Sequence, residues 1–281
     1  MATGIDVDGY LRRLRLTGLA GTPPGTAGLF ALHRAHAERV PYECLEIWLG
    51  RRTTVDPGES AQRILRGRGG YCFHLNGAFA GLLEALGYQV TRHVGGVQGH
   101  ADPSAGASGN HLVLTVSGPD GRWLVDLGMG DGLYEPLPLA EGVYRQGPFT
   151  YGLRPSEAEA GGWRFDHDER GGFAGMDFRP GAVPMTAFTG KHEHLSTSPQ
   201  SVFVRTATVQ RRDSAGADIL RGLTLTRVGS AGTRTVLQEP DDYFGALGDV
   251  FGLTLSDVTP EEKAALWRRL VTAHERWLSE V

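Results

Sequence analysis

The spacing of the apolar residues changes near residue 88, and this change constrains the fold more than any other feature of the sequence. Before it, apolar residues recur three and four positions apart, as in "TAGLFALHRAHAERV" (26–40), which is the period of an amphipathic helix. After it come short runs rich in β-branched and aromatic residues, separated by Gly, Pro and Asp-Gly. A helical part is therefore expected to precede a β-rich part.

Two further helices are predicted in the first part. "DPGESAQRILRG" (56–67) opens on Asp-Pro and closes on Gly, which are start and stop signals. "YCFHLNGAFAGLLEALGY" (71–88) follows a glycine pair and ends at Gly87. This spacing places Cys72 in the first turn of the helix.

The remainder of the chain is predicted to form two more units. Residues 88–190 indicate a compact β-barrel or sandwich, with "SGPDGRW" (117–123) linking two strands as a hairpin. In residues 191–281 the runs "SVFVRTATVQRR", "ILRGLTLTRVG" and "TRTVLQE" indicate an antiparallel meander, and a helix with a capping box at Thr259 and Glu262 follows. The predicted fold is α+β: a helical domain (1–87), a β-barrel domain (88–190) and an α/β lid domain (191–281).

Composition excludes several classes of protein. The 281 residues are 40% apolar and 21% charged with a net charge of −4, which is typical of a globular chain and gives no reason to expect a nucleic-acid partner. No signal pattern or bilayer-length apolar run is present, and no metal site is predicted. Two cysteines do not make a disulfide framework, so a cytoplasmic location is expected, with Cys72 as a free thiol.

The position of Cys72 in the sequence can be interpreted in two ways. Thiol nucleophiles act as thiolates, which a helix N-terminus or a neighbouring imidazolium stabilises, and Cys72 has the first of these by position. Free cysteine is also among the most buried residue types, so a small buried residue after a turn fits equally well.

A base and an acid are predicted to meet beside one hairpin. His111 opens the strand "HLVLTV" directly after "QGHADPSAGASGN" (98–110), a loop expected to be disordered, and Asp126 follows "RWLV" at the end of the next strand. An antiparallel hairpin brings these strand ends together, as a His–Asp pair requires. The order Cys, His, Asp then suggests a cysteine-protease-like triad; the alternative is that Asp126 only caps the turn "DLGMGDG".

Five segments resemble the arylamine N-acetyltransferase family. They are "VPYECLE" (40–46), "RGGYC" (68–72), "NHLVL" (110–114), "LVDLGMG" (124–130) and "LSTSPQSVF" (195–203). The resemblance implies Cys72 as the acyl-accepting nucleophile, His111 as its base and Asp126 as the carboxylate that orients the histidine. It also implies that Arg68 pairs with Glu43 and holds the cysteine turn.

The same resemblance implies the substrates. Acetyl-CoA would donate an acetyl group to the cysteine, and an aromatic amine or hydrazine would accept it in a ping-pong reaction, the chemistry of xenobiotic metabolism. The residues implied to line the acceptor pocket are Tyr42, Tyr71, Phe73, Val97, Met129 and Phe203. Those implied to contact CoA are Ser108, Asn110, Gly128 and Gly130.

Three alternatives remain open from the sequence. Amide synthases that release or cyclise polyketide chains share these motifs and take their acyl group from a carrier protein. A papain- or transglutaminase-like hydrolase has the same order of triad residues, and a catalytically inactive binding module is the third. The chain departs from the family pattern at Cys44, His74 and Met129, where Asn, Glu and an aromatic residue are usual, and Met129 bears on the acceptor pocket.

Overall fold

The helical part of the chain surrounds one long buried helix. A computed structural model describes residues 4–100 and 105–280. The helices of this part are α1 (Val7–Leu14), the 3-10 turn η1 (Thr17–Leu19), α2 (Thr26–Arg39), α3 (Leu45–Trp48), α4 (Pro57–Leu65) and α5 (Cys72–Ala85). Helix α5 packs on α4 and on strand β3 (His111–Gly118), and its apolar side chains fill the core of this part. The three predicted helices are confirmed as α2, α4 and α5.

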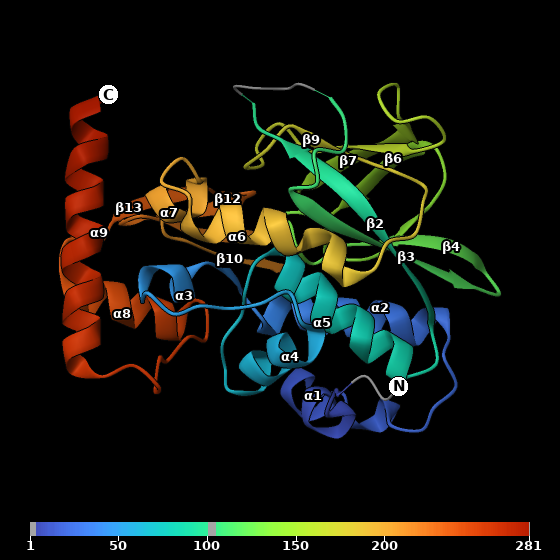
Figure 1. The fold of residues 1–281 in the computed structure, drawn as a ribbon, viewed down its shortest axis with the longest axis horizontal. Helices are drawn as coiled ribbons and strands as arrows, with labels where there is room; N and C mark the ends of the chain where they lie inside the picture. The colour runs from blue at the N-terminus through green and yellow to red at the C-terminus, as the bar shows by residue number, and fades with distance from the viewer. Residues whose placement is uncertain (1–3, 101–104, 281) are drawn as a thin grey trace.

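The middle of the chain forms an eight-stranded antiparallel sheet that is nearly closed into a barrel. Its other strands are β2 (Gln89–Gln98), β4 (Gly121–Val125), β5 (Leu137–Pro138), β6 (Gly142–Gln146), β7 (Phe149–Pro155), β8 (Trp163–Asp166) and β9 (Gly175–Phe178). The strand order is β5-β4-β3-β2-β9-β8-β7-β6, and aromatic residues of β7, β8 and β9 fill the interior. In Figure 1 this sheet lies above α2 and α5, so one end of the β3–β4 hairpin meets the N-terminal end of α5.

A second, five-stranded sheet joins the two ends of the chain. It has the order β1-β10-β11-β12-β13, with β1 (Tyr42–Glu43), β10 (Thr208–Asp213), β11 (Gly216–Arg221), β12 (Thr224–Gly229) and β13 (Thr233–Val236). Because Tyr42 pairs with Gln210, the edge strand comes from the helical part and the rest from the C-terminal part. The predicted α+β class is confirmed; the three-domain division remains a prediction.

The C-terminal part differs from the prediction in two places. Residues 202–205 were expected in a strand but form α7 (Val202–Arg205), because the Ser201 hydroxyl accepts from the N–H of Phe203 at 3.2 Å and starts a helical turn. Helix α8 (Pro240–Asp249) was not predicted. The remaining helical elements are η2 (Met185–Phe188), α6 (Thr189–Thr197) and α9 (Pro260–Glu280).

Two local predictions for the loops and helix caps can be compared with the structure. At the start of α9, the Thr259 N–H donates to Glu262 at 2.8 Å and the Glu262 N–H donates back to Thr259 at 3.2 Å, so the predicted capping box is confirmed. Part of the loop expected to be disordered, 101–104, lies outside the described residues; residues 106 and 107 are fixed by hydrogen bonds to Asp177 and Glu159. No helix within 4–100 or 105–280 has the length and apolarity to span a bilayer.

A buried arginine ties the turn before α5 to the C-terminal part. Arg68 is 2% exposed, and its guanidinium lies 2.7 Å from Glu46, 3.1 Å from Asp257 and 3.8 Å from Glu43. The pair with Glu43 that the family resemblance implied is thus the longest of the three. Glu43 is satisfied mainly by the backbone, because its carboxylate accepts from the N–H groups of Leu45 at 2.5 Å and Gly69 at 3.2 Å.

Replacing Arg68 should destabilise the protein strongly. Arg68→Ala leaves the buried Glu43 and the partly buried Glu46 without their paired cation, so we expect the free energy of unfolding to fall by about 3–5 kcal/mol. Urea denaturation followed by circular dichroism measures this. Arg154→Ala is the matched control, because Arg154 pairs with Asp166 at the surface and its loss should cost less than about 1 kcal/mol. Equal effects of the two variants would contradict the assigned role of Arg68.

Candidate active site

Cys72 is the first residue of α5 and follows a turn that only glycine allows. A Cβ at Gly69 would lie 1.9 Å from the carbonyl oxygen of Pro41, and one at Gly70 would lie 2.6 Å from Cβ of His74. The backbone can therefore fold tightly against its neighbours before the helix begins. Cys72 is 3% exposed, and its Sγ lies 3.6 Å from the carbonyl oxygen of Asn110. The thiol thus sits at the unpaired N–H end of a helix.

The hairpin brings His111 and Asp126 together as expected. His111 is the first residue of β3, and Asp126 directly follows β4, which pairs with β3 in antiparallel register. The His111 Nε2 lies 2.7 Å from Asp126 Oδ2, and both side chains are buried. The imidazole is therefore held at one nitrogen by a carboxylate, which leaves the other nitrogen to face a reacting group.

The pKa of His111 reports how strongly its neighbours favour the imidazolium. Burial alone would lower this pKa, but the charge of Asp126, the charge of Cys72 and hydrogen bonds to both side chains raise it well above its ordinary value. His111 is thus in contact with both other members of the predicted triad. A thiol, an imidazole and a buried carboxylate arranged in this order can serve as a nucleophile for acyl transfer.

Asn76 fixes the carboxylate, and sequence reasoning did not single it out. It lies one turn after Cys72 on the same face of α5 and is fully buried. Its amide nitrogen donates to Asp126 Oδ1 at 2.9 Å and to the Leu112 carbonyl at 2.7 Å, and its oxygen accepts from the Leu127 N–H at 2.8 Å. The i, i+4 spacing from Cys72 within an apolar helix was the available signal.

The residues expected to line an acceptor pocket divide into two groups. Tyr71 and Phe203 stack near the nucleophile with ring centroids 4.8 Å apart, and Tyr42 packs on Phe203 at 6.4 Å. Phe73 instead lies in the core, where its ring packs on Phe188 at 5.1 Å. The turn before Cys72 is thus bordered by aromatic rings on the side of α7.

The other predicted pocket and CoA residues border two separate spaces. Met129 and Tyr42 line a narrow cavity of about 10 Å³ beside Asp126, enough for one water molecule. Val97, Ser108 and Asn110 line an open cavity of about 440 Å³. Cys72 is near both cavities. Its Sγ contacts the carbonyl oxygen of Asn110, which lines the open cavity. Its Cα packs against Gly128, the residue before Met129, which lines the narrow cavity.

The two glycines expected to contact CoA permit close packing in the structure. A Cβ at Gly128 would lie 2.6 Å from the Cα of Cys72. At Gly130, which has a positive φ of 65°, a Cβ would lie 1.7 Å from the side-chain oxygen of Gln210. The loop 128–131 is therefore pressed between α5 and β10.

A groove rich in arginine begins where this loop ends, and sequence reasoning did not predict it. Asp131 accepts from the N–H of Gly172 at 2.6 Å, and a Cβ at Gly172 would lie 3.2 Å from the guanidinium of Arg221. Gly172 and Arg221 line a groove of about 570 Å³ together with Arg170 and Arg234, and no acidic side chain lines it. We call it the Arg221 groove. Its residues lie far apart in the sequence and share no motif.

Comparisons with known proteins agree with this geometry. The family model described as N-acetyltransferase matches residues 27–259. An arylamine N-acetyltransferase from Mycobacterium tuberculosis is 30% identical over 278 residues, covering 95% of both chains. One from Mycolicibacterium smegmatis is 38% identical over 149 residues, which is 50% of this chain and 53% of that protein. The chain thus spans about half the length of the first curated relatives it matches.

A solved structure extends the likeness to three dimensions. The arylamine N-acetyltransferase of Mycobacterium marinum in complex with CoA superposes with a TM-score of 0.83 at 27% identity, over 94% of this chain and 98% of that one. The sequence matches and the shared fold together settle the classification. The chain belongs to the arylamine N-acetyltransferase family.

Loss of the Asn76 amide should cost stability. Asn76→Ala leaves the buried Leu127 N–H, the Leu112 carbonyl and one oxygen of Asp126 short of a partner, so we expect the free energy of unfolding to fall by about 3 kcal/mol. Urea denaturation measures the change. Gln62→Ala, which removes an exposed amide from α4, should stay within about 0.5 kcal/mol of the parent. A loss at Asn76 no larger than that would refute this account of the network.

The two cysteines should differ sharply in reactivity although both are buried. Burial raises the pKa of Cys44 to about 12, so at pH 7 only about one molecule in 10⁵ carries a Cys44 thiolate. Cys72 is equally covered but faces His111. We expect iodoacetamide at pH 7 to alkylate Cys72 far faster than Cys44, as measured by peptide mass spectrometry. His111→Gln should remove the difference; equal rates in the parent protein would show that Cys72 is not activated.

Proposed function

We propose that this protein transfers an acetyl group from acetyl-CoA, through a thioester on Cys72, to the nitrogen of an aromatic amine or hydrazine. The observation that carries the proposal is the arrangement of Cys72, His111 and Asp126. The imidazole contacts the thiol on one side and is held at 2.7 Å by a buried carboxylate on the other. Membership of the arylamine N-acetyltransferase family supports N-acetyl transfer as the reaction of this arrangement.

In the first half-reaction the Cys72 thiolate attacks the carbonyl carbon of the donor thioester. The bond to the CoA sulfur breaks, the acetyl group stays on Cys72, and the leaving thiolate takes the proton held by His111. One thioester replaces another, so this step is close to thermoneutral. The N–H group of Cys72, at the first position of α5, is a candidate to stabilise the tetrahedral oxyanion.

In the second half-reaction the neutral nitrogen of the acceptor attacks the acetyl-cysteine. His111 takes the proton that the nitrogen loses, the C–S bond breaks, and the Cys72 thiolate returns. The aromatic side chains of Tyr42, Tyr71 and Phe203 supply an apolar surface beside the nucleophile that suits a flat, uncharged amine. Burial of Cys72 protects the acetyl-cysteine from hydrolysis.

The Arg221 groove is the proposed site for the phosphates of CoA. Arg221 and Arg234 suit a diphosphate, because guanidinium groups bind phosphate oxygens in pairs. The loop 128–131 connects this groove to the nucleophile, since Gly128 packs on Cys72 and Asp131 binds Gly172. The relative from M. marinum has been solved with CoA, which supports acetyl-CoA as the donor.

Acetyl transfer should depend on Cys72 and not on Cys44. Incubation with acetyl-CoA alone should add one acetyl group to Cys72, detected by mass spectrometry, and adding a simple arylamine should discharge it with turnover. Cys72→Ala should lower the turnover rate by at least about 10³-fold, whereas Cys44→Ala should retain most of it. No acetyl-cysteine and no turnover in the parent protein would overturn the proposed activity.

A further inference from the structure

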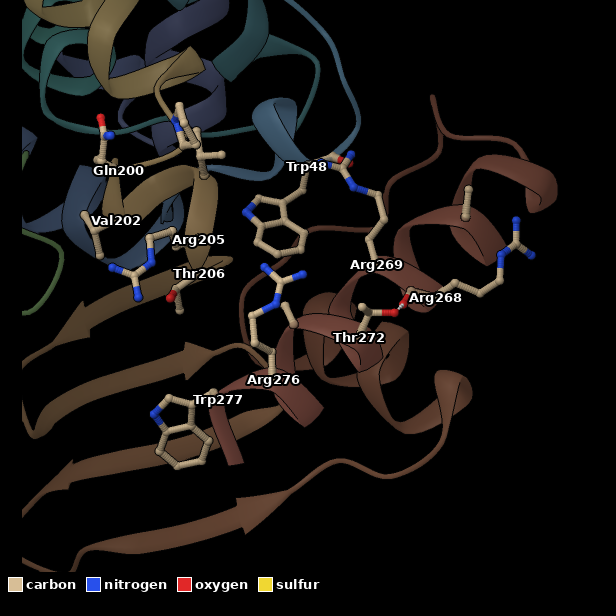
Figure 2. A pocket seen from close by; sticks show the side chains of 14 residues that line it. Trp48, Gln200, Val202, Arg205, Thr206, Arg268, Arg269, Thr272, Arg276 and Trp277 are labelled. Carbon is tan, nitrogen blue, oxygen red and sulfur yellow. Dashed lines mark hydrogen bonds between the residues drawn. The ribbon is translucent and has the colours of Figure 1, made fainter. Parts of the chain in front are cut away.

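A second arginine-rich groove lies between α7 and α9, next to the Arg221 groove. Its volume is about 950 Å³, and its lining includes Trp48 of α3, Val202 and Arg205 of α7, and Arg276 and Trp277 of α9. Figure 2 shows Trp48 between the side chains of α7 on one side and those of α9 on the other. We call this space the α7–α9 groove.

The charge of the α7–α9 groove is entirely positive. Four arginines line it (Arg205, Arg268, Arg269 and Arg276), with no Asp or Glu among those lining residues that the structure describes. This is a local feature, because the whole chain has a net charge of −4. Among the described residues no carboxylate lies within ion-pair distance of the Arg276 guanidinium, which points toward Trp48 in Figure 2. The groove therefore has the positive field that attracts an anion.

Two tryptophans give the groove flat apolar surfaces. Trp48 is 4% exposed and fixed in place, since its indole N–H donates to the Phe203 carbonyl at 2.9 Å and Arg269 lies over its ring at 5.3 Å. Trp277 is 46% exposed, next to Arg276 on α9. An exposed indole can stack on an aromatic ring, and a neighbouring guanidinium without a carboxylate partner can bind an anionic group attached to that ring.

We propose that the α7–α9 groove binds a nucleoside phosphate. The base would stack on Trp277 and the phosphate would pair with Arg276, so that one ligand covers the exposed indole and neutralises the cation beside it. A simple anion would leave the indole exposed, and an uncharged aromatic compound would not neutralise Arg276. A nucleoside phosphate satisfies both features.

The position of the groove allows two sources for this ligand. Arg205, Thr206, Trp48 and Trp277 also border the Arg221 groove, so the nucleotide end of CoA could extend to the α7–α9 groove. That source rests on the proposed function. A free nucleotide would instead be an effector, because Trp48 binds Phe203, and Phe203 stacks on Tyr71 immediately before Cys72.

Calorimetric titration tests the site directly. We expect adenosine 3′,5′-bisphosphate, the nucleotide portion of CoA, to bind the parent protein, and Arg276→Ala to weaken this binding roughly tenfold. Trp277→Ala should weaken it by a similar factor through the loss of stacking. Arg145→Ala is the matched control, because Arg145 is an exposed arginine on β6 in the other sheet. No binding, or unchanged affinity in both groove variants, would overturn the proposal.

Two further measurements distinguish the sources. If the groove holds the nucleotide of CoA, saturating CoA abolishes the binding of adenosine 3′,5′-bisphosphate that depends on Arg276. In that case Arg276→Ala also raises KM for acetyl-CoA, but not KM for a short acetyl thioester without a nucleotide. If it holds a free nucleotide, binding persists in the presence of CoA and KM is unchanged. Either result supports the site. Because the titration needs no acetyl transfer, its failure would leave the proposed activity standing.

Discussion

The buried carboxylate of Asp126 is the interaction on which the arrangement of the site depends. A carboxylate removed from water costs several kcal/mol unless donors surround it. Here the donors come from two separate parts of the chain: His111 and Gly128 from the barrel, and Asn76 from α5. Satisfying one side chain therefore requires the β3–β4 hairpin and the nucleophile helix to meet at hydrogen-bond distance. The same requirement brings Cys72 next to His111.

The C-terminal sheet is attached to this junction through the segment that ends in Cys44. The N–H of Glu43 donates to the Gly70 carbonyl at 2.9 Å, and the N–H of Cys44 donates to the Thr208 carbonyl at 3.2 Å. One short segment is thus hydrogen-bonded to the turn before the nucleophile on one side and to β10 on the other. Arg68 reinforces the link through Asp257, which precedes α9. The position of the nucleophile turn is therefore determined jointly by both ends of the chain, as the shared sheet in Figure 1 illustrates.

Local signals in the sequence predicted many of the helices and strands. Features that depend on tertiary packing could not be predicted from them. Asp56 and Thr259 mark real helix starts, because each caps its helix with its own side chain. The hairpin that joins His111 to Asp126 follows from two short runs and a turn. Residues 202–205 were mispredicted, since three apolar residues in a row indicate a strand, and only the hydroxyl of Ser201 selects the helical turn.

Some of the site residues could likewise be predicted from local sequence and others could not. The order of Cys72, His111 and Asp126 could be inferred from elements adjacent in sequence. The role of Asn76 could not, because a polar residue in an apolar helix does not reveal its partners. The two arginine-rich grooves are assembled from segments between residues 48 and 277, so no window of sequence contains them. Phe73 belongs to the core, because consecutive side chains of a helix are rotated by about 100°, which turns Phe73 away from Cys72 and toward Phe188.

The two cysteines show that the chemistry of the site comes from its neighbours and not from burial. Cys44 and Cys72 are 2% and 3% exposed. The Cys44 Sγ is hydrogen-bonded to the backbone, where it accepts from the Thr208 N–H at 3.2 Å. Burial outweighs this hydrogen bond and raises the pKa of Cys44 to about 12. No cation compensates, and the thiol stays neutral. Around Cys72 the same exclusion of water strengthens the attraction between Sγ and an imidazolium that Asp126 keeps protonated. Burial therefore keeps the Cys44 thiol neutral, whereas Cys72 shares its buried site with an imidazolium.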